Sequence, residues 1–158
     1  LGQGISVAVG MALGFRLAKK PNRVYVLTGD GELQEGLAWE AFMAASHYHL
    51  DNLTVSFLYD DAFYLAAFFD GSIDEVMSLG DLAAKFRAFG FAVCEANGHD
   101  YEALLSALDH REDGKPLAVI CDTIKGKGVS FMENGLGWHG KAPSGDELEK
   151  ALKELEDN

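Results

Sequence analysis

Basic residues are scarce in this sequence. Lysine and arginine together number 13, against 25 aspartates and glutamates, so the formal net charge is −12. Nucleic acids and anionic membranes attract basic surfaces, and we therefore expect neither as a partner. A phosphorylated ligand is still allowed, because a metal ion and main-chain N–H groups can neutralise phosphate locally.

Cysteine is also scarce, with two residues in 158. Cys94 and Cys121 each lie inside an apolar run, which predicts buried thiols in strands and not a disulfide, a metal pair or a nucleophile. No charged and then apolar leader opens the sequence, so nothing indicates secretion. The apolar run over 5–18 contains Arg16 and is too short to span a bilayer. We expect a soluble cytoplasmic protein.

Hydrophobic residues make up 48% of the chain, which is enough to build a core. Helical spacing of apolar residues predicts helices over 5–19, 36–48, 81–89 and 101–108, the first apolar on nearly every side and therefore buried. A capping box of Ser144 and Glu147 predicts a last helix, and Asp100 is a candidate cap. Runs rich in β-branched and aromatic residues predict strands over 23–28, 53–59, 91–95 and 117–122. This alternation predicts an α/β fold, a three-layer sandwich with a mostly parallel sheet and helices on both faces.

The segment Gly29-Asp30-Gly31 directly follows the first predicted strand. Taken alone, it is typical of a tight turn capped by an aspartate. Its position favours a functional interpretation, because ligands of parallel sheets collect at the carboxyl ends of the strands. Glycine lets a ligand approach the main chain closely, and a carboxylate can hold a hard cation that in turn holds a phosphate.

Several segments together resemble transketolase, in particular its thiamine-diphosphate-binding module. They include "LGQGISVAVGMALGFRLAKK", "VLTGDGELQEG", "AVICDTIKGKGVSFMEN" and "WHGKAP", and the resemblance extends over nearly the whole chain. It implies the thiamine-diphosphate-binding fold, thiamine diphosphate with Mg²⁺ or Ca²⁺ as cofactors, and a dimer. The implied reaction is transfer of two-carbon ketol units between sugar phosphates in the pentose phosphate pathway.

The resemblance also implies cofactor-binding residues. The aspartate of the family's GDG motif ligates the metal ion, which makes Asp30 a metal ligand and the Gly31 N–H a donor to the diphosphate. Gly29 belongs to the same cofactor-binding turn. The family's "GPLGQG" segment touches the cofactor, so Leu1 is a further expected contact.

Two residues are implied to be catalytic. Glu35 matches a glutamate at the family's dimer interface, where carboxylates link two active sites. His139, in "WHG", matches a histidine near the diphosphate and the reacting carbons of the substrate. Considered alone, His139 would be interpreted as a histidine of a surface loop.

The stretch "SFLYDDAFYLAAFFDGS" departs from the family, which has a shorter and more polar segment here. Counting from Asp30 without gaps places the family's metal-binding asparagine at Asp60 and a ligating backbone carbonyl at Ala62. The apolar character of residues 56–69 predicts a strand end followed by a helix that packs inward. If exposed, that helix would be an interaction surface or an aggregation hazard.

We expect residues 1–158 to form a single thiamine-diphosphate-binding domain. Against the family pattern, it lacks an N-terminal segment and the pyrimidine-binding module, whose glutamate activates the cofactor. We therefore expect this chain to need a partner, either a pyrimidine-binding module or a separate subunit, and to be inactive alone. The alternative is a truncated or engineered stand-alone domain without catalytic activity.

Overall fold

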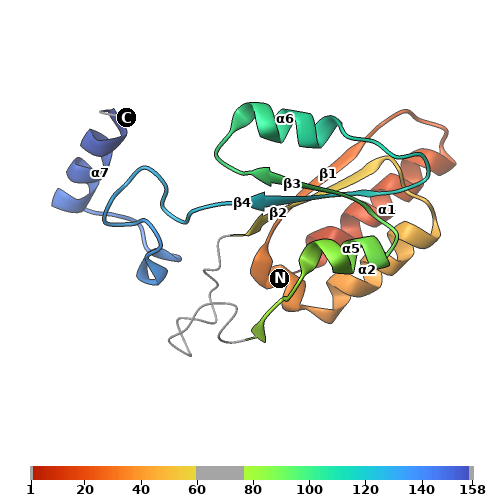
Figure 1. Ribbon diagram of the computed structural model, residues 1–158, viewed down its shortest axis with the longest axis horizontal. Helices are drawn as coiled ribbons and strands as arrows, with labels where there is room; N and C mark the ends of the chain where they lie inside the picture. Colours follow the sequence, from red (N-terminus) through yellow and green to blue (C-terminus); the bar gives the residue numbers. More distant parts are fainter. Residues whose placement is uncertain (1, 60–76, 157–158) are drawn as a thin grey trace. The chain divides into compact units, whose positions relative to one another are not determined.

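Helices and strands alternate along the chain in the computed structural model, which describes residues 2–59 and 77–156 (Figure 1). The strands are β1 (Val24–Gly29), β2 (Leu53–Tyr59), β3 (Ala92–Asn97) and β4 (Leu117–Asp122). The helices are α1 (Gln3–Leu17), α2 (Gly36–His47), α5 (Leu82–Ala88), α6 (Tyr101–Asp109) and α7 (Asp146–Glu156), with short 3-10 helices η1 (Asp30–Gln34) and η2 (Leu136–Trp138). The described residues divide into two compact units, one over 2–59 and 79–122, the other over 77–78 and 123–156. A single domain over 1–158 stays a prediction.

The first unit is built on a four-stranded parallel sheet with the order β1-β2-β4-β3. In Figure 1, α1, α2 and α5 lie on one face of this sheet and α6 on the other. The predicted α/β fold with a parallel sheet and helices on both faces is thereby confirmed. Both β2 and β4 have the predicted bounds, because their runs of apolar and β-branched residues end at polar segments.

An aromatic cluster fills the space between the sheet and the helices α2 and α5. The Phe57 ring on β2 stacks on Phe86 of α5 with centroids 4.6 Å apart, and Phe42 of α2 meets Phe86 edge to face at 5.0 Å. All three side chains are fully buried. Since burial of one large side chain stabilises a fold by roughly 1.5–3 kcal/mol, this cluster contributes strongly to the first unit.

The opposite face of the sheet is covered by α6 over β3 and β4. Ala107 of α6 is buried against Leu117, Val119 and Cys121 of β4, and Leu104 and Leu108 pack against the same cluster. The predicted cap of this helix is confirmed, because the Asp100 carboxylate accepts hydrogen bonds from the N–H groups of Glu102 at 2.9 Å and Ala103 at 3.1 Å. On the same face, Tyr25, Leu27 and Leu58 of β1 and β2 are exposed.

The prediction that the first helix is buried on nearly every side is wrong. Ile5, Ala8, Val9 and Ala12 form the buried side of α1, whereas Val7, Met11 and Leu17 are exposed. The helix packs on β1, β2 and α2 through one stripe only. Apolar residues around a helix show that several sides could be buried, but the number of neighbouring elements decides how many are.

Both cysteines lie in strands, as predicted, and both are free thiols. Cys121 of β4 is buried, and burial raises the pKa of its thiol. Cys94 of β3 is half-buried, and its pKa is raised by burial and then by the negative charge of Glu112. Residues 60–69 of the predicted inward-packing segment lie outside the described residues. Among those described, no helix is both long and apolar enough to cross a membrane.

The second unit contains the glycine-rich loop, η2 and α7. Ser130 Oγ donates to Glu154 Oε1 of α7 at 2.8 Å, and Trp138 Nε1 donates to the Phe131 carbonyl at 2.9 Å. The Ser144 N–H donates to Glu147 Oε2 at 3.4 Å, which is one of the two bonds of the predicted capping box.

Candidate functional site

The Gly29-Asp30-Gly31 segment lies where β1 ends and η1 begins. Asp30 is only 3% exposed, and its Oδ1 accepts a hydrogen bond from the Gly31 N–H at 2.8 Å. A buried carboxylate is costly unless its charge is compensated. A cation is one group that could supply such compensation at Asp30.

Glu32 holds two glycine segments together beside Asp30. Its Oε1 accepts from the Gly2 N–H at 2.9 Å, and its Oε2 accepts from the Gly29 N–H at 3.1 Å. One carboxylate thus joins the start of α1 to the end of β1, although Gly2 and Glu32 are 30 residues apart. This role was not predicted from the sequence. The sequence does contain one indication of it, because a glutamate three residues after Gly29 has the spacing of a capping box.

The end of β1 also has room and a free acceptor for a ligand. A Cβ built on Gly29 would meet no atom within 4 Å, so described neighbours do not fill the space beside this residue. The Oγ1 atom of Thr28, one residue earlier, is buried and has no hydrogen-bond partner among the described residues. Open space beside a glycine, a buried carboxylate and an unsatisfied hydroxyl fit a polar ligand such as a metal-bound diphosphate.

The other predicted metal ligands cannot be placed. Asp60 and Ala62 lie outside the described residues, as does the predicted cofactor contact Leu1. Within 2–59 and 77–156 no group of three histidine, cysteine, aspartate or glutamate side chains could hold a metal ion. Asp30 is therefore a single candidate ligand in this part of the chain, and the remainder of the coordination shell stays a prediction.

The two predicted catalytic residues have different surroundings. Glu35 is exposed at the N-terminal end of α2, and its Cβ lies 3.1 Å from where a Cβ of Gly2 would be. It is thus close to the segment that Glu32 holds, on a surface that a partner could reach. His139 is half-buried directly after η2 in the second unit, so its position relative to Asp30 stays a prediction.

Known proteins resemble this chain over nearly its whole length. Residues 1–156 match the family model described as "Transketolase, thiamine diphosphate binding domain". An apulose-4-phosphate transketolase subunit of Actinobacillus succinogenes is 42% identical over 99% of this chain and 55% of its own length. The 6-deoxy-6-sulfo-D-fructose transketolase subunit SqwG of a Clostridium species is 40% identical over 99% of this chain and 56% of its own length.

Solved structures agree with the family match. Transketolase from Campylobacter jejuni superimposes with a TM-score of 0.87 at 32% identity, over 99% of this chain and 25% of that chain. The chain spans about half the length of the two transketolase subunits from Actinobacillus succinogenes and the Clostridium species. A family model that covers nearly every residue, and a fold that agrees with it, lead to one conclusion: the chain belongs to the transketolase thiamine diphosphate binding domain family.

Proposed function

We propose that this chain binds the diphosphate end of thiamine diphosphate through a divalent cation at the carboxyl end of β1. The observation that supports this proposal is the buried carboxylate of Asp30, 3% exposed, beside the open space at Gly29. A hard cation such as Mg²⁺ or Ca²⁺ prefers carboxylate and phosphate oxygens, which is the ligand set this position would assemble. In this proposal Asp30 holds the cation and the Gly31 N–H donates to the diphosphate.

The remaining contacts of the proposed site come from residues that the structure does not describe. Asp60 and the Ala62 carbonyl would complete the metal shell, and Leu1 would contact the cofactor. Glu32 would act as a positioning residue, because it keeps the main chain of Gly2 and Gly29 in register for these contacts. It would not itself touch the cofactor.

The complete protein is proposed to transfer two-carbon ketol units between sugar phosphates. When bound, thiamine diphosphate supplies the nucleophilic carbon for this reaction. His139 would lie near the diphosphate and the reacting carbons of the substrate, and Glu35 would lie at a dimer interface, where its exposure leaves it accessible. Several relatives are named as transketolase subunits, which supports a partner chain that carries the pyrimidine-binding module. A cytoplasmic location belongs to the same proposal.

Calorimetric titration with thiamine diphosphate in the presence of Mg²⁺ tests the proposed site. We expect saturable heat that disappears with EDTA, and Asp30→Asn should weaken binding by at least about tenfold, since a charged ligand to the cation becomes neutral. Asp109→Asn is the matched control, because it removes the same charge from the end of α6. No heat with the unchanged chain would instead support a stand-alone domain without cofactor.

A further inference from the structure

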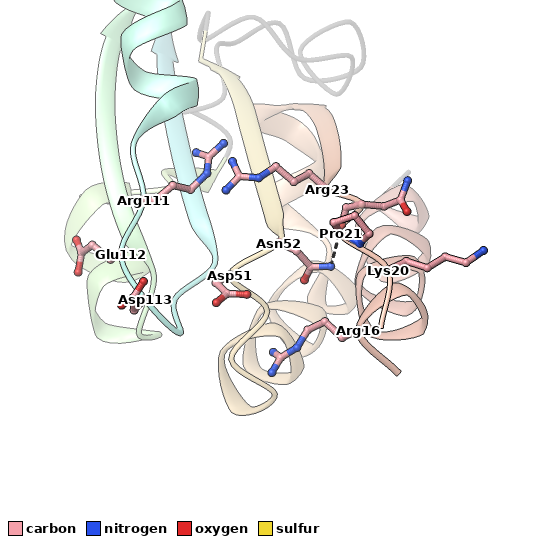
Figure 2. A pocket seen from close by; sticks show the side chains of 10 residues that line it. Arg16, Lys20, Pro21, Arg23, Asp51, Asn52, Arg111, Glu112 and Asp113 are labelled. Atoms are coloured by element: carbon pink, nitrogen blue, oxygen red, sulfur yellow. Dashed lines mark hydrogen bonds between the residues drawn. The ribbon is translucent and has the colours of Figure 1, made fainter. Parts of the chain in front are cut away.

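A charged cavity lies at the amino ends of the strands, opposite to the end that carries Asp30. Its volume is about 320 Å³, and it lies where the chain enters β1 at Arg23, β2 at Asn52 and the approach to β4 at Arg111 (Figure 2). β1 has six residues. At 3.3 Å per residue the two ends of this strand are about 20 Å apart, so the cavity is separate from the proposed cofactor site.

Basic residues outnumber acidic ones in the lining of this cavity, four to three. Four of its lining residues, Arg16, Lys20, Arg23 and Arg111, are basic, although the whole chain has only 13 lysines and arginines and a net charge of −12. One of them is already used by the fold, because Arg16 donates to the Tyr48 and His49 carbonyls at the end of α2. Arg16 Nη1 therefore has a structural role at the end of α2. The candidates to bind a ligand are basic side chains that keep N–H donors not bound to main-chain carbonyls.

Arg111 and Arg23 face each other from two different parts of the chain. Figure 2 shows their guanidinium groups pointing toward one another. Arg111 Nη1 is held by the Leu108 and His110 carbonyls, and its Nη2 donates to the Tyr25 hydroxyl at 3.3 Å. Because that hydroxyl accepts from Arg111, its own proton is free to donate to a ligand.

No carboxylate among the described residues forms an ion pair with Arg23 or Arg111. Glu112 also lines the cavity, but its carboxylate is bound by Lys115 at 2.5 Å and lies 3.6 Å from His110. Asp51 and Asp113 line the cavity as well, yet within 2–59 and 77–156 no ion pair joins either of them to Arg23 or Arg111. In Figure 2 both aspartates lie away from the two facing guanidinium groups.

We propose that this cavity binds a phosphate group between Arg23 and Arg111, with the Tyr25 hydroxyl as a third donor. Two cations that face each other repel, and an anion between them converts that repulsion into attraction. Planar guanidinium groups bind phosphate through paired N–H donors. The donors left on both arginines and Tyr25 exceed what the two oxygens of a carboxylate can accept, which favours phosphate over a carboxylate. This site does not rest on the proposed function.

An NMR titration of the ¹⁵N-labelled full chain with inorganic phosphate tests the site. We expect saturable shifts of the amide signals of Arg23, Tyr25 and Arg111, and about tenfold weaker binding in Arg23→Gln, since one charge-assisted contact is lost. Arg23 is exposed, and its side chain makes no hydrogen bond or ion pair within 2–59 and 77–156, so this change should not disturb folding. Tyr25→Phe should weaken binding by about threefold, and acetate should bind about tenfold more weakly than phosphate.

Arg87→Gln is the matched control, because Arg87 is an exposed arginine of the same unit that pairs with Glu95 at 3.4 Å outside the cavity. It should leave phosphate binding unchanged. The proposal is overturned if phosphate causes no saturable shift, or if the shifts are confined to residues 29–31 at the other end of β1. It is equally overturned if Arg87→Gln weakens binding as much as Arg23→Gln, or if acetate binds as well as phosphate.

Discussion

Two halves of one sheet face differ sharply in burial. On β4, beneath α6, Val119 is 0% exposed and Cys121 is 3% exposed. At matching register on β1 and β2, Leu27 is 65% exposed and Leu58 is 39% exposed. All four are apolar side chains on the same face of a parallel sheet. The covered half is therefore β3 with β4, and the open half is β1 with the end of β2 at Leu58, whereas Thr54 at the start of β2 is buried.

The difference follows from where α6 lies. Leu104, Ala107 and Leu108 of α6 pack against β3 and β4 and remove their side chains from water. Strands of a parallel sheet are buried on both faces only where helices cover both. The two halves thus have similar side chains, and a nearby helix decides whether those side chains contribute to stability.

The largest expected difference between the halves is in the stability lost when a leucine is truncated to alanine. Leu117→Ala on the covered half should lower the free energy of unfolding by about 2–5 kcal/mol, because it leaves a cavity under α6. Leu27→Ala on the open half should change it by less than about 0.5 kcal/mol, because the side chain is already in water. Urea denaturation followed by circular dichroism measures both. Equal losses would show that Leu27 is covered in solution.

Thiol reactivity gives the next largest contrast. Leu58→Cys introduces a thiol on the open half in register with the native Cys121. Burial raises the pKa of the Cys121 thiol above its ordinary range, so less of it is the reactive thiolate at pH 8. We expect iodoacetamide to modify residue 58 at least about tenfold faster than Cys121, with site-specific rates from peptide mass spectrometry. The ratio of the two rates should narrow as the pH is raised further, because more of Cys121 becomes thiolate. Similar rates at pH 8 would mean that α6 does not shield β4.

The smallest expected effect concerns the end of the covering helix. Asp100→Ala removes the cap of α6 and should cost about 1 kcal/mol of stability. Hydrogen exchange should become faster in the first turn of α6 and remain unchanged in α2. Asp109→Ala, at the C-terminal end of the same helix, is the control and should stay within about 0.5 kcal/mol. If both variants behave alike, the cap is not what holds α6 over the covered half.

The candidate site was predictable in part. The position of Asp30 at the carboxyl end of β1 follows from a strand pattern that ends at glycine, whereas its role as a metal ligand stays a prediction. No local pattern predicts the hydrogen bond from the Gly2 N–H to Glu32, because it joins residues 30 positions apart. Only the Glu32 bond to Gly29 has a local spacing that points to it.

Local sequence patterns were sufficient to predict the order of strands and helices, the bounds of β2 and β4, the Asp100 cap and the glycine turn after β1. Each depends on residues within a few positions of one another, which is the range over which periodicity and capping act. Tertiary packing was needed to establish which side of α1 is exposed, which half of the sheet face α6 covers, and that Arg111 meets Tyr25 from 86 residues away. A local pattern shows that a side chain can be buried, but burial requires another element to pack on it, and that element comes from a distant part of the chain.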